Sequence, residues 1–363
     1  MKNFQKTTGL KQLSKYTRKK TGKRRTIFRL SIVSFFVIIL AFIFYGDKFS
    51  IGKDNDKIFS KNSVVEGVFD ESNNKKSIVS KYSFPVAIYK PTKKPEATKL
   101  SVSNAHASVI LDVDSGTLLH YENGEQKRQI ASLTKLMTAV LVVEKIKNLD
   151  KEVVTIDADA VYQEGTKIGC PRSGYCISNR LKIGEKISAK SLLMAMLMNS
   201  ANDSAVALAK HIAGSEKDFV KMMNEKAKEM GLKNTNFCTP SGLEIDGHEE
   251  ECYSSAYDVA RIAVYSMRYK IIWDIFKTPG TKIYSIDGKY SHKIFNTDRL
   301  LDEMPNCLGT KTGFTPLAGK SLMLAAIDKS GKHRVVAVVL DDPYRWRDAK
   351  NMIEWAFESY LWK

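Results

Sequence analysis

Strand-like segments lie at both ends of residues 104–363, and a long helical stretch separates them. Ala107–Val113 and Thr117–Tyr121 are predicted to form a hairpin around an Asp-Ser-Gly turn. Because strands must pair to satisfy their backbone groups, the two ends of this region are expected to complete one sheet. The remaining predicted strands lie in the last hundred residues: Thr281–Ile286, Gly309–Thr315, Ser321–Asp328 and His333–Leu340.

Apolar residues recur at helical spacing in the middle of this region and again at its end. Gly231 follows one of these patterns directly, as expected of a residue that ends a helix. The sequence therefore predicts an α/β (α+β) domain, with helices inserted between two groups of strands. The predicted helices are Ser132–Lys147, Ala189–Met198, Asn202–Ala213, Glu216–Met230, Ser255–Met267 and the closing Arg347–Trp362.

The N-terminus carries most of the excess positive charge. Of the net +17, ten charges lie in residues 1–25, which contain no acidic residue, and Arg29 adds one more. Leu30–Tyr45 follows as an uncharged apolar run, close to the ~20 residues that a membrane-spanning helix needs. We predict a basic cytoplasmic segment at 1–29 and an uncleaved transmembrane signal anchor at 30–46, with the rest of the chain extracytoplasmic.

Three alternatives to this anchor stay open: a cleaved signal peptide, a buried core helix, and a basic arm that binds nucleic acid. We favour the lipid bilayer as the partner and expect no nucleic acid. Residues 47–103 are rich in Lys, Ser, Asn and Asp, with prolines near their end, and predict a flexible extracytoplasmic stalk. A short strand at Ser63–Val68 would lie within it. The domain at 104–363 would then be held outside a single-pass cell-membrane anchor.

Three short motifs are candidates for chemistry. Ser132 and Lys135 form an S-x-x-K that places both side chains on one face of a helix start. Ser200 and Asn202 form an S-x-N between two predicted helices, and Lys311 begins a K-T-G on a predicted strand. Each motif alone has an ordinary structural explanation: an N-cap, a helix break and an edge strand. Their joint order at these elements favours a catalytic set.

This set resembles the penicillin-recognising serine acyl-enzymes, and most of all the serine-type D-alanyl-D-alanine carboxypeptidases of peptidase family S11, the low-molecular-mass penicillin-binding proteins. The resemblance covers roughly residues 104–360. It implies the β-lactamase/penicillin-binding-protein-like transpeptidase fold, an antiparallel sheet flanked by helices with a helical subdomain. The blocks that carry it are LDVDSGTLLHYENGEQKRQIASLTKLMTA, SLLMAMLMNSANDSAVALA, GLKNTNFCTPSGL, YSSAYDVARIA, LGTKTGFTPLAGKSL and DAKNMIEWAF.

The resemblance also implies the reaction. Ser132 would attack the D-Ala–D-Ala carbonyl of a peptidoglycan stem peptide, Lys135 would take the serine proton, and Ser200 would relay a proton to the leaving amine. Water would then hydrolyse the acyl-enzyme, and β-lactams would acylate the same serine as covalent inhibitors. No metal or cofactor is expected, and the six histidines form no H-E-x-x-H zinc motif.

Substrate binding is assigned in the same way. Asn202 would hold the substrate amide and Lys135, while Lys311 and Thr312 of the K-T-G would bind the terminal carboxylate. The backbone N–H groups of Ser132 and Phe314 would form the oxyanion hole. Arg347 is a weaker candidate for the carboxylate, with an exposed surface arginine as the alternative. The full set of assigned substrate-binding positions is Asn202, Lys311, Thr312, Gly313 and Phe314.

The five cysteines are unusual. Outside a membrane disulfides can form, and we favour Cys170–Cys176 and Cys238–Cys252 with Cys307 free, although the sequence leaves other pairings open. A metal site of Cys238, His248 and Cys252 is a minority alternative.

Three functional rivals also stay open. A β-lactamase shares S-x-x-K and K-T-G, but Ala201 stands where class A enzymes carry Asp. An endopeptidase would share every motif, and a non-enzymatic alternative is an inactive membrane-tethered wall-binding protein.

Overall fold

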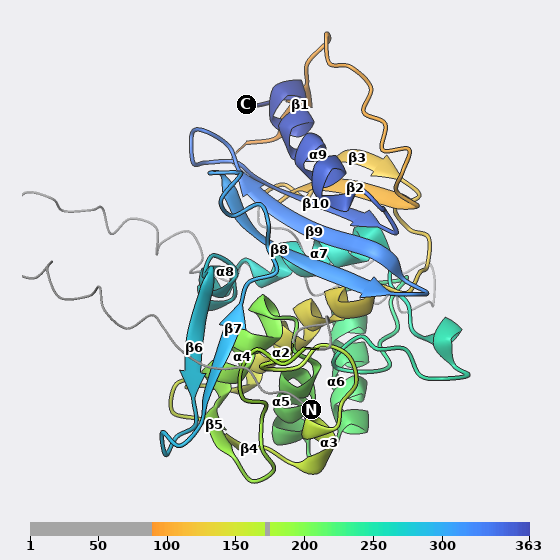
Figure 1. Cartoon of the computed structure of the whole chain (residues 1–363). Coiled ribbons are helices and arrows are strands. Elements are labelled where there is room, and N and C mark those ends of the chain that lie inside the picture. The colour runs from red at the N-terminus through yellow and green to blue at the C-terminus, as the bar shows by residue number, and fades with distance from the viewer. Residues whose placement is uncertain (1–88, 171–174) are drawn as a thin grey trace, which may run out of the picture. The chain divides into compact units, whose positions relative to one another are not determined.

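The computed structural model describes residues 89–170 and 175–363, which fold around one antiparallel five-stranded sheet (Figure 1). The strand order is β3-β2-β10-β9-β8, so the first and last parts of the domain lie next to each other, as the sequence predicts. The strands are β2 (Ala107–Asp112), β3 (Leu118–Glu122), β8 (Cys307–Thr315), β9 (Gly319–Ile327) and β10 (Arg334–Leu340).

Both faces of this sheet are covered, which explains why every residue of β2 is buried. Val109 and Leu111 pack with the helical middle of the chain, whereas Ile110 between them packs with the C-terminal helix. This alternation is the period of two that a pleated strand imposes. Helix α7 (Ala256–Ser266) lies against one face, and α9 (Arg345–Ser359) lies against the other (Figure 1).

The helical middle forms a lobe beside the sheet (Figure 1). Predicted helices at Ala189–Met198 and Asn202–Ala213 are found at these bounds as α4 and α5. The helix predicted from Ser132 instead begins as a 3₁₀ turn, η3 (Ala131–Thr134), before α2 (Lys135–Lys145) continues. The other elements of the lobe and its surroundings are α3 (Ala158–Val161), α6 (Glu216–Glu229), η4 (Glu249–Glu251), α8 (Lys270–Phe276), β4 (Val153–Thr155) and β5 (Lys186–Ser188).

The strand predicted at Thr281–Ile286 does not join the main sheet. It forms β6 (Gly280–Tyr284), which pairs only with β7 (Ser291–Phe295) as a separate hairpin. The sequence pattern missed β7, and it also missed that the predicted closing helix ends at Ser359. The last residues form β11 (Tyr360–Trp362), which pairs with β1 (Pro91–Lys93).

Strand β1 lies within the stretch predicted as a stalk, so the folded domain begins by Pro91 rather than at residue 104. Val102 is buried in the same core as α9, which also places this stretch in the domain. Strand β1 is difficult to predict from the sequence because the residues around it are polar and two of its three residues, Thr92 and Lys93, are exposed.

The predicted basic segment, the transmembrane anchor, the stalk up to residue 88 and the strand at Ser63–Val68 lie outside the described residues. Among the residues that the structure does describe, no helix is both long enough and apolar enough to cross a membrane.

A buried ion pair ties the β6–β7 hairpin to the lobe. His292 Nε2 lies 2.7 Å from Glu185 Oε1, and His292 Nδ1 lies 2.8 Å from the Asn179 carbonyl oxygen. Both side chains of the pair are fully buried. Because both ring nitrogens face acceptors, this site favours the doubly protonated imidazole. Burial alone lowers the pKa of His292, but the hydrogen bonds to Glu185 and Asn179 outweigh it and raise the pKa above its usual 6.5.

We therefore expect this pair to contribute stability below pH 6.5 and to lose it as the pH rises through the raised pKa of His292. His292→Leu would leave the Glu185 carboxylate buried without its cation and cost about 3 kcal/mol of unfolding free energy. Urea unfolding at several pH values measures both effects. A difference in unfolding free energy between the wild-type and the variant that is the same at every pH would contradict the assignment.

Candidate active site

The predicted nucleophile Ser132 and base Lys135 lie together in the structure. Lys135 Nζ is 2.9 Å from Ser132 Oγ, and Ser132 lies in η3 immediately before α2 begins. Ala131, just before the serine, has a φ of 47°, which is the left-handed region that alanine rarely adopts. Such strain is typical of functional sites, where the surrounding packing holds a catalytic turn in place.

Lys135 is fully buried and has two further partners. Its Nζ is 2.7 Å from Asn202 Oδ1 and 2.6 Å from the Ser241 carbonyl oxygen. A neutral amine has two N–H donors and one lone pair. If the amine is neutral, the two oxygens take both donors, and the lone pair then points at the Ser132 hydroxyl. Burial, followed by the positive charge of Lys311, lowers the pKa of Lys135 well below 10.5, which favours this neutral form.

The S-x-N and K-T-G motifs supply a second serine–lysine pair. Lys311 Nζ donates to Ser200 Oγ over 2.9 Å and to the Thr312 carbonyl oxygen over 2.9 Å. Ser200 has a φ of 58°, so this residue is also held in a strained conformation. Burial, and then the nearby Arg345 cation, lower the pKa of Lys311 to about 7. The two members of this pair, Ser200 and Lys311, lie 111 residues apart in sequence.

Asn202 links Lys135 to the segment at residues 164–168. Its Nδ2 donates to the Glu164 carbonyl oxygen over 2.8 Å, while its Oδ1 faces Lys135. The next residue, Asp203, is buried and accepts a hydrogen bond from the Ile168 N–H over 2.9 Å. Burial raises the pKa of Asp203 to about 6. The start of α5 therefore holds the 164–168 segment against the base.

A cleft of about 660 Å³ opens over these groups. Gly313 allows β8 to approach η3 closely, because a Cβ there would lie 2.7 Å from the Ile130 carbonyl oxygen. This is the close contact that an oxyanion hole between β8 and the serine turn requires. Ser132, Ser200, Asn202, Thr312, Gly313 and Phe314 all line the cleft, together with Glu164, Asp298, Arg299, Arg345 and Trp346 among others.

Arg345 rather than Arg347 lies at the site, where Arg299 also lines the cleft. Arg345 lines the cleft and donates to the Gly313 carbonyl oxygen over 2.7 Å. Arg347 pairs with Asp348 at 2.7 Å, keeps 57% of its side chain exposed, and does not line the cleft. The surface alternative for Arg347 is therefore confirmed. The two arginines are two residues apart at the start of α9, and the sequence alone offers no means to choose between them.

The structure pairs the cysteines as favoured: Cys170 with Cys176 and Cys238 with Cys252, while Cys307 is free and buried. The sulfurs of Cys238 and Cys252 are thus bonded to each other and not offered to a metal as thiolates. Within residues 89–170 and 175–363, no three His, Cys, Asp or Glu side chains gather as a metal site would require.

The sequence matches a known family over most of the described domain. The sequence profile described as D-alanyl-D-alanine carboxypeptidase, peptidase S11, matches residues 92–344. The chain belongs to this family. Its relatives include the D-alanyl-D-alanine carboxypeptidase DacF of Bacillus subtilis, which is 36% identical over 70% of this chain. A D-alanyl-D-alanine endopeptidase of Pseudomonas aeruginosa is 31% identical over 69% of this chain and 76% of its own length.

Solved structures of family members have the same fold. Penicillin binding protein 5 of Haemophilus influenzae aligns with a TM-score of 0.62 and 30% identity, over 72% of this chain and 73% of that one. A D-alanyl-D-alanine carboxypeptidase of Mycobacterium tuberculosis aligns with a TM-score of 0.64 and 26% identity, over 74% and 96%. The predicted transpeptidase-like fold is confirmed. The chain spans 63% of the Bacillus subtilis relative and 62% of the Haemophilus influenzae DacA, less than two thirds of either.

Acylation at Ser132 is expected to slow as the pH falls. Lys135 accepts a proton only when its amine is neutral, and Lys311 becomes cationic below about pH 7. Between its folded pKa and 10.5 each lysine is charged only in the unfolded chain, so stability rises with pH across that window. Stopped-flow labelling by a fluorescent penicillin between pH 5 and 9 measures the rate. A rate that rises toward acid would contradict the neutral-base assignment.

Proposed function

We propose that this chain is a serine-type D-Ala-D-Ala carboxypeptidase that removes the terminal D-alanine from peptidoglycan stem pentapeptides. One observation carries the proposal: the Lys135 amine lies within hydrogen-bond distance of Asn202 Oδ1, the Ser241 carbonyl oxygen and Ser132 Oγ, so in its neutral form it can donate to the first two and turn its lone pair toward the Ser132 hydroxyl. A serine with such a neighbour can act as a nucleophile without a metal or histidine. Family membership supports the substrate, since relatives at 36% and 33% identity are named D-alanyl-D-alanine carboxypeptidases.

In the acylation step, Ser132 Oγ forms a bond to the carbonyl carbon of the penultimate D-alanine while its proton passes to Lys135 Nζ. The carbonyl oxygen becomes an oxyanion, which the N–H groups of Ser132 and Phe314 would stabilise. Collapse of this intermediate breaks the peptide bond, and the proton held by Lys135 passes through Ser200 to the leaving amine, with Lys311 beside Ser200 setting the local field, so that Lys135 is neutral again. Free D-alanine departs and an ester remains on Ser132.

In the deacylation step, water attacks the ester carbonyl and gives up a proton to Lys135. The ester bond to Ser132 breaks, the serine regains its proton, and the shortened tetrapeptide leaves with a new carboxylate. Thr312 and Arg345 line one end of the cleft and supply a hydroxyl and a positive charge there, while the buried Lys311 bonds to Ser200 Oγ and to the Thr312 carbonyl oxygen beside them. We assign that end to the C-terminal carboxylate of the stem peptide, or to the carboxylate of a β-lactam.

Penicillin acylation, membrane attachment through residues 30–46 and an extracytoplasmic location are part of the same proposal. The apolar run behind a basic N-terminus supports the anchor, and disulfides support an oxidising compartment. A single-pass anchor would hold the domain near its peptidoglycan substrate. Protease protection in sealed membrane vesicles, read at an epitope on each side of residues 30–46, tests the topology.

An endopeptidase that cuts cross-links is the second candidate. It is favoured by relatives named D-alanyl-D-alanine endopeptidase, of which this chain covers 76% and 83%. A β-lactamase stays the third, and rapid turnover of penicillin rather than a long-lived acyl-enzyme would identify it.

Mass spectrometry of a D-Ala-D-Ala pentapeptide and of a purified cross-linked dimer, each incubated with the protein, tests the proposal. Loss of one alanine from the pentapeptide with the dimer intact supports the carboxypeptidase. Cleavage of the dimer alone supports the endopeptidase. An unchanged pentapeptide together with fast penicillin hydrolysis would contradict the proposal.

A further inference from the structure

The carbonyl that orients Lys135 belongs to a loop closed by a disulfide. Cys238 and Cys252 are bonded and lie 14 residues apart, with Cα atoms 5.4 Å from each other. The loop between them, residues 239–251, contains no helix or strand before η4. Its first half contributes Gly242 and Leu243 to the wall of the cleft. Because this half has no helix or strand pairing of its own, its position depends on its contacts with the rest of the domain.

Three anchors join the first half of the loop to the catalytic helix and turn. Thr138, one turn after Lys135 on α2, donates to the Pro240 carbonyl oxygen over 2.7 Å. Lys135 Nζ faces the next carbonyl, that of Ser241, at 2.6 Å. Gly242 packs so closely on Ala131 that a Cβ at this position would lie 2.0 Å from the Ala131 carbonyl oxygen. A displacement of the loop would therefore reach both the base and the serine turn.

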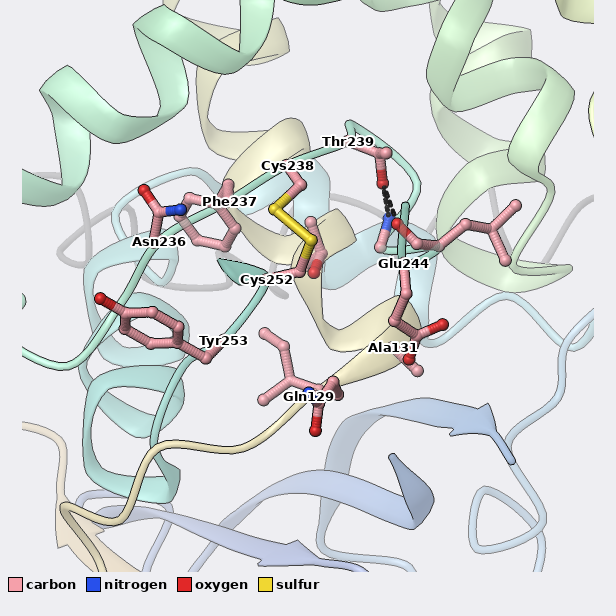
Figure 2. Close-up of a pocket in the computed structure, with 13 residues that line it drawn as sticks. Gln129, Ala131, Asn236, Phe237, Cys238, Thr239, Glu244, Cys252 and Tyr253 are labelled. Carbon is pink, nitrogen blue, oxygen red and sulfur yellow. Dashed lines mark hydrogen bonds between the residues drawn. A yellow bond between two sulfur atoms is a disulfide. The ribbon is translucent and has the colours of Figure 1, made fainter. Parts of the chain in front are cut away.

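The base of the loop is closed by the disulfide and by hydrogen bonds. Figure 2 shows the disulfide between the Thr239 and Tyr253 segments, facing Gln129 and Ala131. A cavity of about 20 Å³ lies there, lined by both cysteines and by the serine turn. Besides the sulfur–sulfur bond, the paired backbone groups of Asn236 and Tyr253 close the loop, at 2.8 and 3.0 Å. Asn236 Nδ2 also donates to the Glu251 carbonyl oxygen over 2.7 Å, and Gln129 Nε2 donates to the Glu249 carbonyl oxygen over 3.0 Å.

We propose that the Cys238–Cys252 disulfide is a positioning element of the active site, which holds the Ser241 carbonyl against Lys135 so that its reduction slows acylation of Ser132. The proposal rests on the proposed function for its kinetic consequence. Its structural consequence, a loosened 239–244 segment, does not depend on any activity. Both cysteines are only half-buried, so a small thiol can reach the bond.

The chemistry of the switch is ordinary thiol–disulfide exchange. A dithiol reductant attacks one sulfur, the Cys238–Cys252 bond breaks, and the reductant is oxidised to its own cyclic disulfide. The two protons and two electrons that the reductant gives up convert Cys238 and Cys252 to thiols. Cys307 is buried beside Asp298, and burial raises the pKa of its thiol to about 12, so it supplies no competing thiolate.

Loosening the loop changes the environment of Lys135 in two ways. The amine loses one of the two acceptors that direct its lone pair, and water reaches the opened site. Burial is the largest cause of the lowered pKa of Lys135, so hydration moves that pKa back up. We expect the acid limb of the pH–rate profile for acylation to shift to higher pH by about one unit. At any pH on that limb, the acylation rate is then about tenfold lower.

The experiment compares Cys238→Ser/Cys252→Ser with a matched control, Cys170→Ser/Cys176→Ser, in the purified full chain with and without dithiothreitol. In the control the cleft-lining segment stays held by other contacts: Asn202 N–H to the Thr166 carbonyl oxygen and Ile168 N–H to Asp203. Two quantities are measured: hydrogen exchange of peptides that cover 239–244, and the pH profile of penicillin labelling. Circular dichroism confirms that each protein is folded.

We expect faster exchange at 239–244 and a shifted acid limb in the 238/252 variant. Dithiothreitol should produce both changes in the wild-type and in the control, but no further change in the 238/252 variant. Unchanged exchange in a folded 238/252 variant would overturn the proposal, as would an equal shift in the control variant without reductant. If the wild-type protein is not labelled at all, the proposed function fails, and exchange at 239–244 still decides the positioning role. If the 238/252 variant does not fold, the wild-type protein titrated with dithiothreitol gives the same two readouts.

Discussion

Replacing the nucleophile, Ser132→Ala, is expected to abolish both D-alanine release and covalent labelling by penicillin. The hydroxyl that Lys135 faces at 2.9 Å is the group proposed to form the acyl bond, and Thr134, the other hydroxyl-bearing residue of η3, is buried and does not line the cleft. Ser200 bonds to Lys311 instead of Lys135. Loss of a serine nucleophile costs enzymes of this kind on the order of 10⁴-fold or more in turnover. Intact-protein mass spectrometry after penicillin treatment reads the label directly.

The fold should tolerate this change, because removing one hydroxyl from a half-buried turn costs about 1 kcal/mol. Ser330→Ala is a matched control, since Ser330 is exposed in the turn before β10 and bonds only to neighbouring turn residues. This control should label at the wild-type rate. Persistent labelling of Ser132→Ala would refute the assignment of the nucleophile, wherever the label then resides.

Replacing the base, Lys135→Met, is expected to slow acylation about 1,000-fold while the chain still folds. General bases contribute about 10²–10⁴-fold, and Met fills a similar volume without an amine. The acceptors at Asn202 and Ser241 each lose their donor, which costs about 1–3 kcal/mol per unsatisfied group. Stopped-flow acylation and urea unfolding together separate the chemical effect from the loss of stability.

Lys145→Met is the matched control on the same helix. Lys145 ends α2 and is exposed, whereas Lys135 begins α2 and is fully buried. The control should retain wild-type acylation. A Lys135→Met protein that acylates at the wild-type rate would show that another group accepts the serine proton. A protein that loses its circular dichroism signal would require the comparison to be repeated with Lys135→Gln.

The sequence predicted the site better than it predicted the edges of the fold. Ser132 with Lys135 and Ser200 with Lys311 were assigned through motifs, and the structure brings each pair within 2.9 Å. Catalytic side chains leave a recognisable pattern of residue types. Strands β1, β7 and β11 were missed because they are short and partly exposed, so their apolar alternation is weak.

Other site groups carry no pattern that sequence could reveal. The Ser241 carbonyl faces Lys135 across 106 residues of chain, and any residue type would supply the same oxygen. Asp203 and Arg345 are ordinary charged residues until burial and neighbours define them. Residues 91–103 are predicted as part of a stalk because their polar composition resembles a linker, although β1 pairs with β11 and Val102 packs in the same core as α9.

By itself, the sequence determined the family, the order of the three motifs and the side chains that we propose to react. These are properties of residue type and spacing, which a chain displays before it folds. Only the tertiary structure decided the protonation of the lysines, the choice of Arg345 over Arg347, and the contact between the disulfide-closed loop and Lys135. The physical reason is that burial, charge proximity and main-chain acceptors arise between segments distant in sequence, and exist only once those segments pack together.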